Sequence, residues 1–189
     1  MLDFTAFNKR EQTINDVAEG LTVRDLHLLT DEMIDTIAAI IADAQDADVT
    51  FVPSDPQAKD TFGKAEDADL AWTLGHVIVH GTASSEESAA ISANLARGLV
   101  IEGRSRYETD WQSVHTVAEL QQRLDESRRM RHSFLNAWPD APHLDVTYVP
   151  FPGYVAINAV SRFIFGLAHD DSHLEQLREI MRQTRNARA

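Results

Sequence analysis

The stretch TVRDLHLLTDEMIDTIAAIIADA, residues 22–44, decides the fold class. Its large apolar side chains recur at steps of three and four residues. They include Leu26, Leu29, Met33, Ile37 and Ile40. Because an α-helix turns once every 3.6 residues, this spacing gathers the side chains on one face. The stretch therefore predicts a helix that packs one face against a core.

The same period continues along the chain and predicts three more long helices. They are expected at 67–97, 116–137 and 158–184. Thr116, with Glu119 three residues later, forms the sequence pattern of a capping box, and Asn158 can cap the last helix. The stretch LAWTLGHVIVHGTA is apolar nearly all round, which indicates deep burial of the helix at 67–97.

The segments between these helices are read as connections. Residues 3–18 form a weakly amphipathic, extra N-terminal helical segment, and long loops are expected at 47–66 and in the proline-rich stretch 138–154. Residues 100–116 look irregular. The prediction is a single all-α domain over residues 1–189, since 189 residues are enough to bury a core.

The charge of the chain excludes some partners. A net charge of -13 repels phosphate backbones and anionic membranes, so neither nucleic acid nor membrane binding is expected. Two basic clusters, RRMR at 128–131 and the arginines at 178, 182, 185 and 188, are interpreted as a solvated helix face and a helix C-terminus.

Cysteine is absent from the sequence, so any metal site must use His, Asp, Glu or water. The first residues, MLDFTAFNKREQ, lack the pattern of a signal peptide. No apolar run approaches the roughly 20 residues of a membrane span. A cytoplasmic protein is expected.

Two histidine pairs of the same spacing carry the functional signal. His76 and His80 lie in one predicted helix, and His169 and His173 lie in another. Residues four apart share a helix face, so each pair can direct two imidazoles at one ion. A single HxxxH is more often structural or accidental than functional, but two pairs on two apolar helices are harder to explain in that way. Glu87 extends the first stripe by two turns.

Other readings of the pairs stay open at this point. The stripe of His169, His173 and Gln176 lies beside the apolar arc of its helix, which fits either a site at the mouth of a bundle or plain exposure. Neither pair belongs to an HExxH motif, so the base of that class of metalloprotease is absent.

The segments DADLAWTLGHVIVHGTASSEES (67–88) and NAVSRFIFGLAHDDSHLEQLREI (158–180) resemble the second and fourth helices of the DinB-like family of metalloenzymes. The resemblance implies a four-helix bundle of up-down-down-up topology with one divalent ion, which is zinc, nickel or a similar metal. Carried over, His80, His169 and His173 are the ligands. His76 departs from the family pattern, and is either a fourth ligand or a residue that orients one.

The resemblance also suggests reactions. The family includes S-transferases and a maleylpyruvate isomerase that depend on a low-molecular-weight thiol, and many members without a known reaction. A thiol-dependent S-transferase acting on a small molecule, with Glu87 handling protons, is the first hypothesis. A metal-dependent hydrolase and a non-catalytic, stress-responsive metal-binding protein are the alternatives. A homodimer is expected, because family members often dimerise.

Overall fold

The computed structural model describes residues 1–55, 70–100 and 106–189. Over these residues the regular secondary structure is helical, and β pairing is limited to one isolated antiparallel bridge between Tyr148 and Ile157. The predicted all-α class is confirmed.

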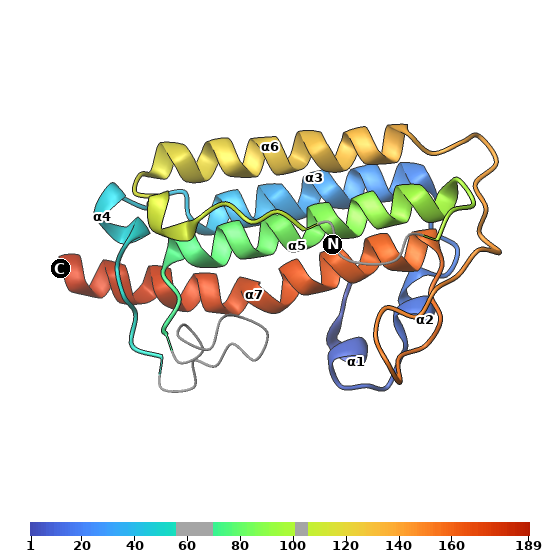
Figure 1. The fold of residues 1–189 in the computed structure, drawn as a ribbon. Coiled ribbons are helices and arrows are strands. Elements are labelled where there is room, and N and C mark those ends of the chain that lie inside the picture. The colour runs from blue at the N-terminus through green and yellow to red at the C-terminus, as the bar shows by residue number, and fades with distance from the viewer. Residues whose placement is uncertain (56–69, 101–105) are drawn as a thin grey trace.

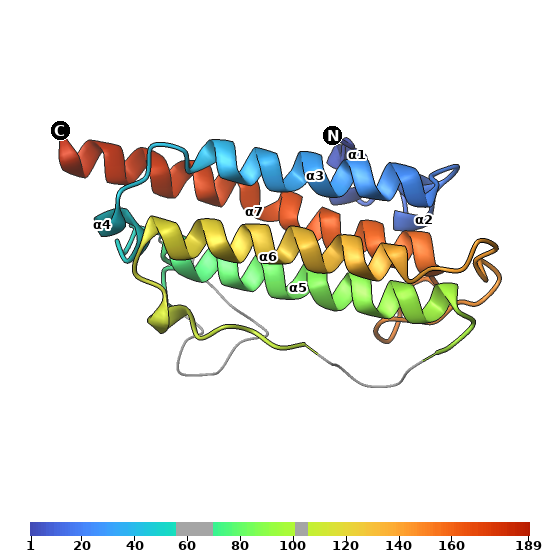
Figure 2. The same ribbon diagram turned by 90° about the horizontal axis from the view of Figure 1, so that it is seen from above.

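Four long helices lie side by side and form the body of the molecule (Figures 1 and 2). They are α3 (Val23–Ile40), α5 (Leu74–Ala96), α6 (Val117–Asn136) and α7 (Ala159–Arg188). The colour gradient in Figure 1 shows that α3 and α7 run in one direction and that α5 and α6 run in the other. In chain order these directions read up, down, down, up.

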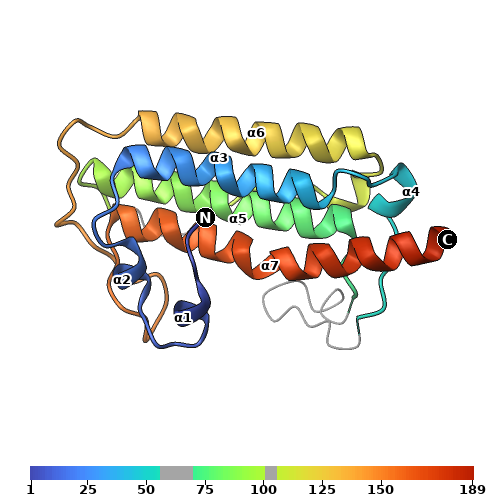
Figure 3. The ribbon, with the colours of Figure 1, turned by 180° about the vertical axis from the view of Figure 1, so that it is seen from behind.

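Short helices accompany the four long ones. The N-terminal segment expected at 3–18 consists of two separate helices, α1 (Thr5–Asn8) and α2 (Ile14–Ala18), and α2 packs against α7 (Figure 3). The helix α4 (Asp46–Val49) and the 3₁₀ helix η1 (Trp111–Ser113) lie next to one end of α5. Of the loop predicted at 47–66, residues 56–66 lie outside the described residues. Residues 101–105 of the segment read as irregular lie outside them too.

Capping side chains set the starts of α6 and α7 where the sequence predicts them. The hydroxyl of Thr116 accepts a hydrogen bond from the backbone N–H of Glu119, and the Glu119 carboxylate accepts one from the Thr116 N–H in return. The Asn158 side chain accepts from the N–H of Ser161 at 3.1 Å. Both caps satisfy N–H groups that have no partner inside the helix.

Three helix boundaries differ from the prediction. The helix expected from 67 begins at Leu74, because Thr73 is extended and its hydroxyl caps the N–H of His76; residues 67–69 lie outside the described part. Helix α3 ends at Ile40 rather than at 44. Helix α7 continues beyond 184 to Arg188, since Arg185 and Arg188 both pair with Asp43 across the bundle.

Helix α5 is the central element of the core. It packs against both α6 and α7, and most of its side chains are buried, as its apolar sequence predicts. No helix in the described part of the chain is long and apolar enough to cross a membrane.

The basic cluster at 128–131 is not the solvated face that the sequence suggests. Arg128 pairs with Asp31 on α3, and Arg131 is 1% exposed and pairs with Asp170 on α7 at 2.6 Å. Only Arg129 is largely solvated among these three. The interpretation is wrong for Arg131 because its partner lies 39 residues away, where local sequence gives no sign of it.

Candidate metal centre

Small residues bring α5 and α7 close together next to the histidines. The hydroxyl of Ser85 donates to the carbonyl oxygen of Gly166 at 2.9 Å, and the hydroxyl of Ser92 donates to that of Ala159 at 2.6 Å. A Cβ atom at Gly166 would lie 2.6 Å from the Cβ of Ser88, which is closer than side chains tolerate. The absence of a side chain at Gly166 therefore permits this approach.

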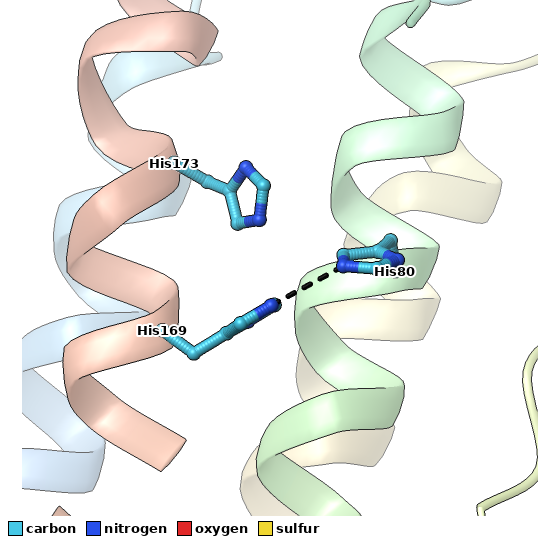
Figure 4. Close-up of side chains that lie close together, drawn as sticks. All are labelled: His80, His169 and His173. Atoms are coloured by element: carbon cyan, nitrogen blue, oxygen red, sulfur yellow. Dashed lines mark hydrogen bonds between the residues drawn. The ribbon is translucent and has the colours of Figure 1, made fainter. Parts of the chain in front are cut away.

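Three histidines meet in the space between these helices (Figure 4). His80 projects from α5, and His169 and His173 project from α7. One ring nitrogen from each lies within 4.8 Å of the others, and the Nε2 atoms of His80 and His169 are 3.2 Å apart. Zinc–nitrogen bonds of about 2.0–2.1 Å in a tetrahedron separate two ligand nitrogens by about 3.4 Å. The spacing is that of a site for one ion.

A hydrogen bond fixes how His173 faces the centre. Its Nδ1 lies 2.9 Å from Oε1 of Gln176, one turn further along α7. An amide oxygen only accepts, so Nδ1 carries the proton and Nε2 keeps its lone pair. This is the arrangement in which an imidazole can bind a cation, and such a partner commonly orients a metal-binding histidine.

The surroundings keep the α7 histidines neutral. Burial is the main cause that lowers the pKa of His169 to about 2, and the nearby His173, His80 and the guanidinium of Arg106 disfavour a further positive charge there. Burial also lowers the pKa of His173, although the hydrogen bond with Gln176 opposes this effect. Because only a neutral imidazole binds a metal, both side chains are ready for an ion at neutral pH.

The second ring nitrogen of His169 is Nδ1, which is buried. Among the described residues it has no hydrogen-bond partner. A buried polar atom without a partner costs free energy. With the ring proton on Nδ1, Nε2 keeps the lone pair that faces His80 and that could bind an ion. The three residues therefore fit the divalent ion that the family resemblance implies.

Aromatic rings line the centre on the side of α5. Trp72 stacks on His76 and lies 4.5 and 5.7 Å, ring centre to ring centre, from His80 and His173. The ring of His76 lies between Trp72 and Trp111, stacked on both. His76 is thus a neighbour of the site and lies outside the group of three described histidines that share the centre. Its role as a fourth ligand stays a prediction.

The carboxylate next to the centre is one that the sequence did not single out. Glu108 Oε1 lies 3.6 Å from Nδ1 of His80, and Arg106 pairs with the same carboxylate. Burial raises the pKa of Glu108, but the nearby His80 ring and the charge of Arg106 outweigh it and hold the pKa below its usual range. Both residues lie in the segment read as irregular, where no periodicity points to them.

Glu87 lies further away. It is buried on α5, seven residues and so about 10 Å along the helix from His80. Its charge acts on Tyr148, whose pKa is raised first by burial and then by Glu87, against the lowering effect of Arg162. The catalytic role predicted for Glu87 stays a prediction.

The fold and the site together define a class of protein: a helical protein with a three-histidine group between two antiparallel helices. A family model described as the DinB superfamily matches residues 29–177. The chain belongs to the DinB superfamily. Searches of curated proteins and of solved structures found no match.

Proposed function

We propose that this protein binds one divalent ion, zinc or nickel, through His80, His169 and His173. The observation that carries the proposal is the convergence of three imidazole nitrogens within 4.8 Å. The low pKa of His169 and the Gln176 bond to His173 support it, since both favour neutral rings with a free nitrogen.

The reaction we propose joins a low-molecular-weight thiol to a small electrophile. The thiol gives up its proton, its sulfur forms a bond to the electrophilic carbon, and the group displaced from that carbon leaves with the bonding electrons. When bound, an ion held by three protein ligands keeps an open position and lowers the pKa of a thiol that takes it. The chain has no cysteine, so the thiol is a cosubstrate. The family resemblance favours this reaction over hydrolysis.

The protein's own residues would hold and shield the site. Gln176 orients His173, and Trp72 covers the imidazoles of His76 and His80 with an apolar surface that excludes water from that side. Arg106 places a positive charge at the edge of the site, 3.0 Å from Nδ1 of His80, where an anionic group of a substrate would be stabilised.

Metal loading tests the ligand assignment. We expect wild-type protein, loaded with zinc or nickel and desalted, to keep one ion per chain by elemental analysis. His169→Ala and His173→Ala should lose it, since each removes one of three ligands. His143→Ala is the control, because that side chain is 56% exposed in the proline-rich loop. Retention of a full equivalent by the His169 variant would refute the assignment.

Turnover separates the three functions. Loaded protein is incubated with an electrophile in the presence and absence of several thiols, and thiol consumption is followed. Thiol-dependent product formation supports the transferase. Product without thiol supports a hydrolase, and binding without any product supports a metal-binding protein.

A further inference from the structure

His80 has two neighbours at the ring nitrogen that points away from the other histidines. Nη2 of Arg106 lies 3.0 Å from Nδ1 of His80, and Oε1 of Glu108 lies 3.6 Å from the same atom. The guanidinium can only donate a hydrogen bond and the carboxylate can only accept one. The two neighbours therefore favour opposite tautomers of His80.

The closer contact, between Arg106 and Nδ1, favours one of the two tautomers of His80. With Arg106 donating to Nδ1, the proton of a neutral His80 ring is on Nε2, which faces Nε2 of His169 at 3.2 Å. Nε2 of His169 accepts this hydrogen bond, so the proton of His169 is on its buried Nδ1, which has no partner among the described residues. One chain of hydrogen bonds thus accounts for both contacts of His80.

An ion at the centre requires the other tautomer. If Nε2 of His80 binds a cation, its lone pair is used there and the proton moves to Nδ1 by exchange with water, with no net change in protonation. Nδ1–H can no longer accept from Arg106. The acceptor within reach is Glu108, which needs to approach by about 0.6 Å to form a bond of ordinary length.

Arg106 holds Glu108 in position for this exchange. Its Nη2 also contacts the Glu108 carboxylate and, at 3.2 Å, the backbone carbonyl oxygen of His80. Because Nη2 has two hydrogens for three acceptors, one N–H is shared between the ring nitrogen and the carbonyl oxygen of His80. The bond to the carbonyl oxygen holds Arg106 next to α5 whichever tautomer the His80 ring adopts. The ion pair with Arg106 in turn keeps Glu108 near the ring.

We propose that Glu108, anchored by Arg106, is the positioning residue for His80: it accepts the Nδ1–H bond when an ion is bound, and loading switches the tautomer of His80. This inference rests on the proposed metal site. Carboxylates that orient a metal-binding histidine in this way contribute about ten- to hundredfold in affinity.

The test measures zinc affinity and the tautomer separately. Competition with a chromophoric chelator should show about tenfold weaker zinc binding for Glu108→Gln, which keeps a weaker acceptor, and a larger loss for Glu108→Ala. Glu175→Gln is the matched control, because it removes the same charge from an arginine-paired carboxylate on α7 that is 84% exposed. It should bind zinc as tightly as the wild type.

Nitrogen-15 NMR of the histidine rings gives the readout that a purely structural role would not change. In the wild type, zinc should move the His80 proton from Nε2 to Nδ1, and the Nδ1–H signal should be shifted downfield by the carboxylate. Glu108→Ala should lose that shift while keeping one ion at saturating zinc and an unchanged circular dichroism spectrum.

The outcomes separate the inference from the proposed function. If wild-type protein binds zinc and both Glu108 variants bind it equally well, the inference is wrong and the metal site stands. A His80 proton on Nδ1 both with and without zinc would also overturn the switch. If the wild type binds no ion, the metal site and the inference fall together.

Discussion

At the scale of single residues, a buried ion pair lies directly next to the three-histidine group. Asp170 directly follows His169, is 2% exposed, and accepts from Arg131 at 2.6 Å. Burial raises the pKa of Asp170 and the guanidinium of Arg131 opposes this. The pair connects α6 to the turn of α7 that carries the histidines.

We predict that Asp170→Asn destabilises the protein by about 3–5 kcal/mol, because it leaves a buried guanidinium without its counter-charge. Urea unfolding gives the free energy. Asp171→Asn, the same change one residue later where the carboxylate is half-buried, should cost under about 1 kcal/mol. If both substitutions change the free energy of unfolding equally, the ion pair does not contribute more to stability than an ordinary half-buried carboxylate does.

At the scale of elements, the packing of α5 on α7 decides whether the histidines can meet. The contact depends on Gly166, where a Cβ atom would also lie 3.3 Å from the Cα of Ser85. Backbone atoms of α5 cannot move aside as a flexible side chain can. A larger residue there would push the two helices apart and separate His80 from His169.

We predict that Gly166→Ala lowers the free energy of unfolding by about 1–3 kcal/mol, the usual cost of overpacking, and weakens zinc binding. Gly81→Ala is the control. Its Cβ would meet Asp170 at an ordinary 3.5 Å, so the gain in helix propensity should leave stability unchanged or higher. Adding Ser88→Gly to Gly166→Ala should restore part of the loss; no rescue would contradict the proposed clash.

At the scale of the whole molecule, the buried histidines link stability to pH. Burial is the main cause that lowers the pKa of His27, His169 and His173 in the folded protein. The unfolded chain protonates the same side chains near pH 6.5. Below that pH the unfolded state binds more protons than the folded state, so stability falls as the pH falls.

We predict that the metal-free protein, kept in a chelator, loses stability steadily between pH 7 and pH 5. Urea midpoints at several pH values measure this. His169→Gln removes one contributing group and should make the dependence shallower, whereas His143→Gln, at an exposed position, should not. A midpoint that is constant from pH 7.5 to 5 would contradict the prediction.

The sequence by itself determined the helices and the candidate ligands. Apolar spacing and the caps at Thr116 and Asn158 are local signals, because each depends on residues within a turn or two. The i, i+4 spacing of His169 and His173 is local for the same reason. These features could therefore be predicted, along with the family that the motifs resemble.

Only the tertiary structure decided which distant groups meet. The approach of His80 to His169, the pairing of Arg131 with Asp170, and the place of Glu108 beside His80 join residues 28 to 89 positions apart. Local periodicity carries no information about such contacts, since they depend on how whole helices pack and on where the connection between α5 and α6 returns. The helical pattern therefore predicted Glu87 as the carboxylate of the site. The carboxylate that lies beside His80 is instead Glu108, on a segment without periodicity.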